Sequence, residues 1–189
     1  MFLESQINQP IQKGSIEVIC GSMFSGKTEE LLRRLKRAKF AKLKISVFKP
    51  QIDGRYDIRK VVSHDKNTIQ SIPISNPKSM LNLAKNANVV AIDEAQFFGQ
   101  EIISICTQLA NNGSRVIIAG LDMDFLGTPF GVMPQLLAIA EHVTKVHAIC
   151  VDCGSIANHS FRLTKSKELV QLGKKEEYKP LCRQCFNTN

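Results

Sequence analysis

Short stretches of hydrophobic residues recur along the first 149 positions and predict the strands of a β-sheet. Residues 15–20 alternate between apolar and polar positions, whereas residues 89–92 form an unbroken apolar run that leads into Asp93. An unbroken run of this length is typical of a strand that is covered on both faces. The strands predicted in this way cover residues 15–20, 45–48, 68–74, 89–93, 115–119 and 143–149.

Between these strands, apolar positions recur with the period of an α-helix. The first such segment, residues 28–39, places its leucines on one face and its basic side chains on the other. Asn111-Asn112-Gly113 is a stop signal for a later helix, and Pro134 suits the first turn of another. Helices are therefore predicted over residues 28–39, 77–85 and 100–110, and from Pro134 onward.

The order of these elements predicts an α/β fold. Strands that alternate with helices form a mostly parallel sheet with helices on both faces. Residues 51–66 and 121–133 are rich in polar residues, glycine or proline and predict loops. The alternation stops at Cys150, so we expect an α/β domain over residues 1–148 and a small C-terminal domain over residues 149–189.

Composition and charge narrow the choice of function. Of 189 residues, 43% are hydrophobic and 22% are charged, and the apolar runs are far shorter than the roughly 20 residues of a membrane span. We therefore do not expect a membrane protein. The amino terminus has neither the basic region nor the apolar region of a secretory signal, so we expect a cytoplasmic protein and not a secreted one. The net charge of +8 comes from the segment Leu31–Ile52, which has eight bases and no acid. Its aromatic residues do not interleave with the bases, so a solvated helix face is expected and not a nucleic-acid partner.

Residues 21–28 carry the strongest signal in the chain. Gly21-Ser22-Met23-Phe24-Ser25-Gly26-Lys27-Thr28 fits the pattern G-x-x-x-x-G-K-[ST], between a predicted strand and a predicted helix. The glycines let successive backbone N–H groups face phosphate oxygens, and the helix amino terminus adds partial positive charge. Lys27 would lie on the β- and γ-phosphates and the Thr28 hydroxyl on Mg²⁺. The segment therefore predicts a P-loop NTPase core.

Two carboxylates end the buried strand over residues 89–93. Ligands bind at the carboxyl ends of strands in open α/β sheets, so Asp93 and Glu94 are expected at the same edge as the phosphate loop. Asp93 is predicted to hold Mg²⁺, and Glu94 is placed to accept a proton from an attacking water or hydroxyl. Asp122 and Asp124 follow the end of another predicted strand. They could face the ligand crevice, or they could stabilise a turn, and both interpretations stay open.

Four of the six cysteines form two pairs, Cys150-x-x-Cys153 and Cys182-x-x-Cys185. Such pairs close tetrahedral Zn²⁺ sites, and four thiolates leave no open position, so a structural zinc is predicted. A redox dithiol and free thiols are the alternatives. The four histidines show no ligand spacing and are expected to be non-metal.

These motifs indicate a protein that binds a nucleoside triphosphate, and they leave three functions open. The first is a kinase for a small molecule. The second is an ATPase stimulated by nucleic acid, which the positive charge and the zinc site favour. The third is a nucleotide-dependent switch or structural protein. A phosphorylation assay against a panel of nucleosides, with single-stranded DNA as a control, separates them.

The motifs also resemble those of a known family. The phosphate loop at 21–28, Asp-Glu-Ala-Gln-Phe-Phe at 93–98, Gly-Leu-Asp-Met-Asp-Phe at 120–125, Pro-Phe-Gly at 129–131 and both cysteine pairs are similar in sequence and order to the cellular-type (type II) thymidine kinases. The resemblance runs from about Gly14 to Phe186. It implies transfer of the γ-phosphoryl group of ATP to the 5′-hydroxyl of thymidine, a homotetramer, feedback inhibition by the end-product triphosphate, and a zinc-anchored lasso loop that closes on the nucleoside.

The resemblance also implies roles for individual residues. Glu94 corresponds to the base that accepts the 5′-hydroxyl proton, and Arg55 to a residue that stabilises charge on the transferring group. Lys27, Thr28, Asp93 and Gln96 correspond to contacts of ATP·Mg²⁺. The residues implied in binding thymidine are Met23, Leu121, Phe125 and Tyr178, together with the main chain of Val170, Gln171, Leu172 and Gly173.

Overall fold

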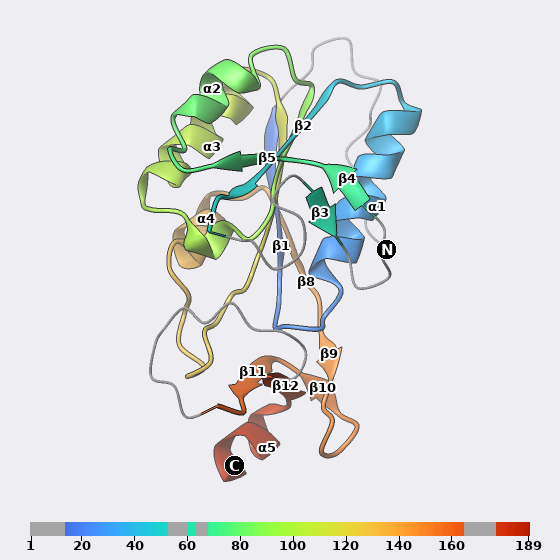
Figure 1. Ribbon diagram of the computed structural model, residues 1–189, viewed down its shortest axis with the longest axis vertical. Coiled ribbons are helices and arrows are strands. Elements are labelled where there is room, and N and C mark those ends of the chain that lie inside the picture. Colours follow the sequence, from blue (N-terminus) through green and yellow to red (C-terminus); the bar gives the residue numbers. More distant parts are fainter. Residues whose placement is uncertain (1–13, 53–59, 63–67, 165–176) are drawn as a thin grey trace.

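The computed structural model describes residues 14–52, 60–62, 68–164 and 177–189. Its centre is a six-stranded sheet in the order β5-β2-β6-β7-β1-β8, and every neighbouring pair is parallel (Figure 1). The predicted parallel α/β sheet with a P-loop core is thereby confirmed. Its strands are β1 (Ser15–Cys20), β2 (Ile45–Pro50), β5 (Ile72–Ile74), β6 (Val89–Ile92), β7 (Arg115–Gly120) and β8 (His142–Lys145).

Helices cover both faces of this sheet, as predicted (Figure 1). Neighbouring residues of a strand point to opposite faces, so Val18 of β1 enters one core and Ile19 enters the other. The Ile19 face packs against α1 (Lys27–Phe40) through leucines such as Leu35. The Val18 face packs against α2 (Ser79–Leu83), α3 (Glu101–Asn111) and α4 (Met133–Ile139).

Two predictions about residues 51–74 are wrong. The loop predicted over 51–66 contains β3 (Lys60–Val62), and the strand predicted over 68–74 is two strands, β4 (Thr68–Gln70) and β5. β3 and β4 form an antiparallel pair, whereas β5 joins the edge of the main sheet beside β2. Pro73 lies in β5 and has no N–H to donate, which suits a strand with a neighbour on one side only.

The last predicted strand, over residues 143–149, is also divided. Its first part is β8, which pairs with β1 up to Lys145. The chain then leaves the sheet, and β9 (Ala148–Ile149) pairs with β10 (Ile156–Ala157). A second antiparallel pair, β11 (His159–Arg162) with β12 (Tyr178–Leu181), and α5 (Arg183–Thr188) follow. These elements lie beyond the end of the sheet at which β1 runs into the phosphate loop (Figure 1). The domain boundary between residues 148 and 149 stays a prediction.

Candidate active site

The phosphate-loop sequence connects β1 to α1, in the context that was predicted. Gly21 adopts a φ of 148°, and a Cβ there would overlap the carbonyl oxygen of Val146, so the position requires glycine. Gly26 adopts a left-handed φ of 85° immediately before α1 begins at Lys27. The two glycines thus allow the chain to turn sharply from the strand into the helix.

Lys27 folds back over this loop. Its Nζ donates to the carbonyl oxygen of Ser22 at 2.7 Å, and the Ser25 hydroxyl donates to the same oxygen at 2.7 Å. The Lys27 ammonium therefore lies over the loop, close to the amino terminus of α1, where an anion is favoured. Thr28 lies in the first turn of that helix.

Asp93 and Glu94 follow β6 at the same edge of the sheet. Only β7 separates β6 from β1 in the strand order, and the three strands are parallel. Both side chains are buried, with 6% and 9% of their residue surfaces exposed. An Oδ atom of Asp93 accepts from the Glu94 N–H at 3.1 Å, and Glu94 adopts a left-handed φ of 52°. A non-glycine residue held in this conformation is often part of a functional site.

Gln96 lies between Glu94 and Leu121. Its Nε2 donates to Oε2 of Glu94 at 2.6 Å, and its Oε1 accepts from the Leu121 N–H at 3.0 Å. The sequence analysis placed Gln96 among the contacts of ATP. In the structure, its side chain bonds Glu94, the expected base, and the main chain of Leu121, which is expected to line the thymine pocket.

Arg162 joins two of the residues implied in binding the nucleoside. Its guanidinium carbon lies 3.6 Å from the ring centroid of Phe125, and Nε and Nη2 donate to the Tyr178 hydroxyl at 2.9 and 2.7 Å. Arg162 and Tyr178 are each 7% exposed. Arg162 was not predicted from the sequence, because a single arginine outside any motif carries no signal of its own.

The phosphate loop also contacts the C-terminal strands. The N–H of Met23 donates to the Ser160 hydroxyl at 2.9 Å, and the Ser22 hydroxyl donates to the carbonyl of Ala157 at 3.4 Å. The ring of Phe24 packs against the apolar cluster of the C-terminal strands. Three consecutive loop residues thus hold β10 and β11 beside the site.

The alternatives left open for Asp122 and Asp124 are now resolved in part. Asp124 serves a turn, because its carboxylate accepts from the N–H groups of Leu126 and Thr128 and from the Thr128 hydroxyl. Asp122 is buried, and its Oδ2 lies 2.8 Å from Nζ of Lys145. These contacts are all within the protein and do not assign a ligand to either carboxylate.

Several expected contacts lie outside the described residues. They are Arg55 and the segment from Val170 to Gly173, which includes Gln171 and Leu172. The site described above therefore comes from the phosphate loop, the ends of β6 and β7, the loop after β7, and strands β11 and β12.

The four paired cysteines meet in one cluster, as the spacing predicts. The sulfur atoms of Cys150, Cys153, Cys182 and Cys185 all lie within 4.8 Å of one another. Tetrahedral Zn–S bonds of about 2.3 Å separate sulfur atoms by about 3.8 Å, so the cluster fits a structural zinc ion. Hydrogen bonds from Ser155, through its side chain and backbone, help to lower the pKa of the Cys153 thiol to about 6, whereas hydrogen bonds with Cys153 and Cys182 raise the pKa of the Cys185 thiol to about 12. Among the described residues, no histidine belongs to such a group.

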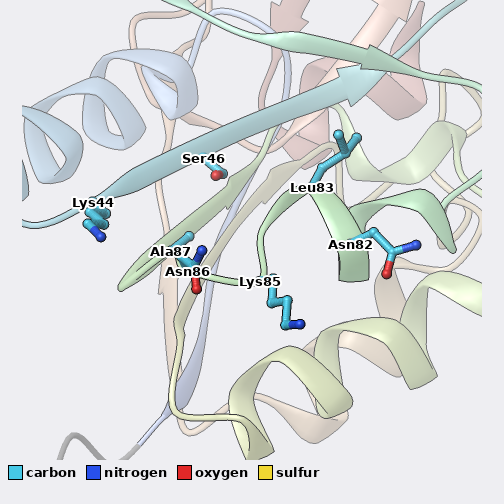
Figure 2. Close-up of a pocket in the computed structure, with 7 residues that line it drawn as sticks. All are labelled: Lys44, Ser46, Asn82, Leu83, Lys85, Asn86 and Ala87. Atoms are coloured by element: carbon cyan, nitrogen blue, oxygen red, sulfur yellow. The ribbon is translucent and has the colours of Figure 1, made fainter.

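A separate pocket of about 220 Å³ is lined by none of these site residues. Figure 2 shows that Lys44, just before β2, and Ser46 in β2 line it, and the remaining wall comes from α2 and the residues after it. Because the strands are parallel, the start of β2 lies at the amino ends of the strands, whereas the phosphate loop lies at their carboxyl ends. Its exposed lysine and asparagine side chains make it an open polar hollow.

Comparisons with known proteins agree with this arrangement. A family model described as thymidine kinase matches residues 14–186. The chain is 59% identical to a thymidine kinase of Bacteroides thetaiotaomicron over 98% of this chain and 94% of that protein. It is 57% identical to a thymidine kinase of Porphyromonas gingivalis, over 97% of this chain and 90% of that protein. It is 56% identical to a thymidine kinase of a Rhodothermus species, over 92% of this chain and 81% of that protein.

In the described part of the chain, no helix combines the length and apolarity of a membrane span.

Proposed function

The chain belongs to the thymidine kinase family, and on this premise we propose that it transfers the γ-phosphoryl group of ATP to the 5′-hydroxyl of thymidine with Glu94 as general base. The observation that carries the proposal is the position of Glu94. A buried carboxylate at the end of β6 shares the edge of a parallel sheet with the phosphate loop and Lys27. This edge is where open α/β sheets bind their ligands.

In the proposed reaction, the 5′-oxygen of thymidine attacks the γ-phosphorus of ATP. A new O–P bond forms, the bond to the β,γ-bridging oxygen breaks, and ADP leaves. Glu94 accepts the proton of the attacking hydroxyl, and Lys27 balances negative charge on the β- and γ-phosphate oxygens. Arg55 is proposed to stabilise the transferring group. Mg²⁺, held by Thr28 and Asp93, would neutralise further charge on those oxygens.

Aromatic and apolar side chains are proposed to form the thymine pocket. Phe125 would stack on the base, and Met23 and Leu121 would face its 5-methyl group. Tyr178 would approach the base and sugar from β12, with a structural zinc ion at the four cysteines anchoring the loop that precedes it. A homotetramer and feedback inhibition by the end-product triphosphate complete the proposal, since the family resemblance implies both.

The Glu94→Gln variant tests this mechanism. The amide keeps the shape of the side chain and cannot accept the proton, so we expect turnover to fall by about 10²–10⁴-fold while an ATP analogue still binds. Glu101→Gln, an exposed acid in the first turn of α3, is the matched control and should keep its rate. A Glu94→Gln rate above about a third of wild type, with chemistry limiting turnover, contradicts the assignment.

The same assay distinguishes the alternative function. Wild-type protein is given ATP·Mg²⁺ and a panel of nucleosides, and separately ATP·Mg²⁺ with single-stranded DNA. We expect thymidine to be phosphorylated and DNA to leave ATP hydrolysis unchanged. Hydrolysis stimulated by DNA, without a phosphorylated nucleoside, supports the nucleic-acid-dependent ATPase instead.

A further inference from the structure

The side chain of Gln96 is held from both ends of its amide. Gln96 lies in the short 3₁₀ turn η1 (Ala95–Phe97), and only 3% of its surface is exposed. The Nε2 atom donates to a carboxylate oxygen of Glu94, and Oε1 accepts from the main-chain N–H of Leu121. Exchanging the two amide atoms would place an acceptor against the carboxylate and a donor against the N–H. The partners therefore fix the orientation of the amide.

Two glycines leave room for this arrangement. A Cβ at Gly120 would lie 2.9 Å from Oε1 of Gln96 and 2.6 Å from the sulfur of Met133. A Cβ at Gly131 would lie 2.6 Å from the backbone oxygen of Gln96. The clash at Gly131 is with backbone, so that position requires glycine, whereas a Cβ at Gly120 would displace the side chains of Gln96 and Met133. The packing against both glycines thus helps to place the Gln96 amide.

We infer that Gln96 is a positioning residue that orients the carboxylate of Glu94 and ties it to the main chain of Leu121. This inference rests on the proposed function, in which Glu94 is the base and Leu121 lines the thymine pocket.

Each hydrogen bond has its own consequence. The bond to Oε2 stabilises the ionised carboxylate and leaves it in one rotamer, so a proton acceptor is ready when the hydroxyl arrives. The bond from Leu121 fixes the first residue after β7, and with it the wall beside the thymine. The buried amide of Gln96 thereby links the position of the general base, Glu94, to the position of the bound nucleoside.

The Gln96→Glu variant separates the two bonds. An ionised glutamate still accepts from the Leu121 N–H, but it cannot donate to Glu94 and places a like charge beside it. Repulsion between the two carboxylates should displace Glu94 from the place where it meets the attacking hydroxyl. At neutral pH, kcat should fall about tenfold or more, while the KM for thymidine changes less than about threefold.

Gln96→Met removes both bonds at nearly constant volume. At neutral pH, kcat should again fall, by less than in Gln96→Glu. The unpaired Leu121 N–H should now also raise the KM for thymidine above that of Gln96→Glu. This second variant keeps the test decisive if Gln96→Glu does not fold, which circular dichroism and binding of an ATP analogue determine.

Gln100→Glu is the matched control, since it adds the same charge four residues away at an exposed position. Its kcat and its KM for thymidine should match those of wild type. A kcat that stays at the wild-type value in both Gln96 variants, or that falls equally in Gln100→Glu, overturns the inference and makes Gln96 a packing residue. Because Glu94→Gln tests the base directly, a loss of activity there with an unchanged kcat in both Gln96 variants leaves the proposed function standing and rejects this inference alone.

Discussion

Arg34 and Glu17 form a buried ion pair, with Nη1 of the arginine 2.6 Å from Oε2 of the glutamate. Arg34 on α1 also bonds Glu30 at 2.8 Å and the Thr144 hydroxyl at 2.9 Å, and Arg115 on β7 donates to Glu17 from the other side. The basic run was predicted to be a solvated helix face, and this is wrong for Arg34, which is fully buried. Part of the positive charge therefore serves the fold.

The Glu17 cluster predicts a pH-dependent stability. Burial acts to raise the pKa of Glu17, but hydrogen bonds and charges from Arg115 and Arg34 outweigh it, and the pKa is lowered from 4.5. The contribution of Glu17 is therefore present above pH 4.5 and is lost as the pH falls through the lower folded-state value. Glu17→Gln leaves Arg34 buried without this partner and should cost about 3–5 kcal/mol of unfolding free energy at pH 7.

Urea unfolding at pH 7 and at several values below 4.5 measures this cost. The deficit of Glu17→Gln relative to wild type should shrink as the wild-type glutamate becomes protonated. Glu101→Gln, which changes an exposed acid, should show almost no deficit at any pH. A deficit of constant size across the range would mean that Glu17 contributes packing rather than charge.

Lys27→Ala is expected to abolish most activity and to keep the fold. The substitution removes the ammonium group that lies over the phosphate loop, where it bonds the carbonyl of Ser22 at 2.7 Å. Loss of such a charge on the transferring phosphates should lower turnover by at least about 10²-fold. Steady-state kinetics and thermal unfolding check both parts, with the exposed Lys39→Ala as the control. An unchanged rate is incompatible with the assigned role of the loop.

Phe125→Ala should weaken thymidine binding selectively. Base–aromatic stacking is worth about 1–3 kcal/mol, so we expect that loss for thymidine and little change for an ATP analogue measured without nucleoside. Calorimetric titration of each ligand gives both affinities, and Phe40→Ala, at a ring that is 88% exposed, is the control. Because Arg162 lies over the Phe125 ring, a core role for Phe125 is the rival explanation. Equal losses for the two ligands would support that rival.

The sequence predicted what is local and missed what depends on distant partners. Residues 89–92 and 115–119 were predictable as strands because each range contains an unbroken apolar run, at 89–92 and at 116–119. The division of residues 143–149 was not, since pairing with residues 156–157 decides it. Likewise, the phosphate loop was predictable from its motif. Arg162 was not, because its contacts are with Phe125 and Tyr178, which are distant from it in the sequence.

In the part of the chain that the structure describes, the C-terminal strands have a small core. Its buried apolar residues are Ala148, Cys150, Ala157 and Leu181, and partly buried hydrophobic side chains pack against them. A segment that buries so little surface does not offset the entropy of its own ordering. We therefore expect a metal clamp at the four cysteines to supply the missing stabilisation.

Cys153→Ser and Cys185→Ser test this clamp. Metal analysis should find about one zinc per chain in wild type and far less in either variant, because a serine hydroxyl is a poor zinc ligand. The sheet lies before Cys150 and should stay folded and bind an ATP analogue, whereas thymidine affinity should fall because β12 carries Tyr178. Asp152→Asn, between the first two cysteines, should keep its zinc. Tight thymidine binding by a zinc-free variant would show that the pocket forms without the metal.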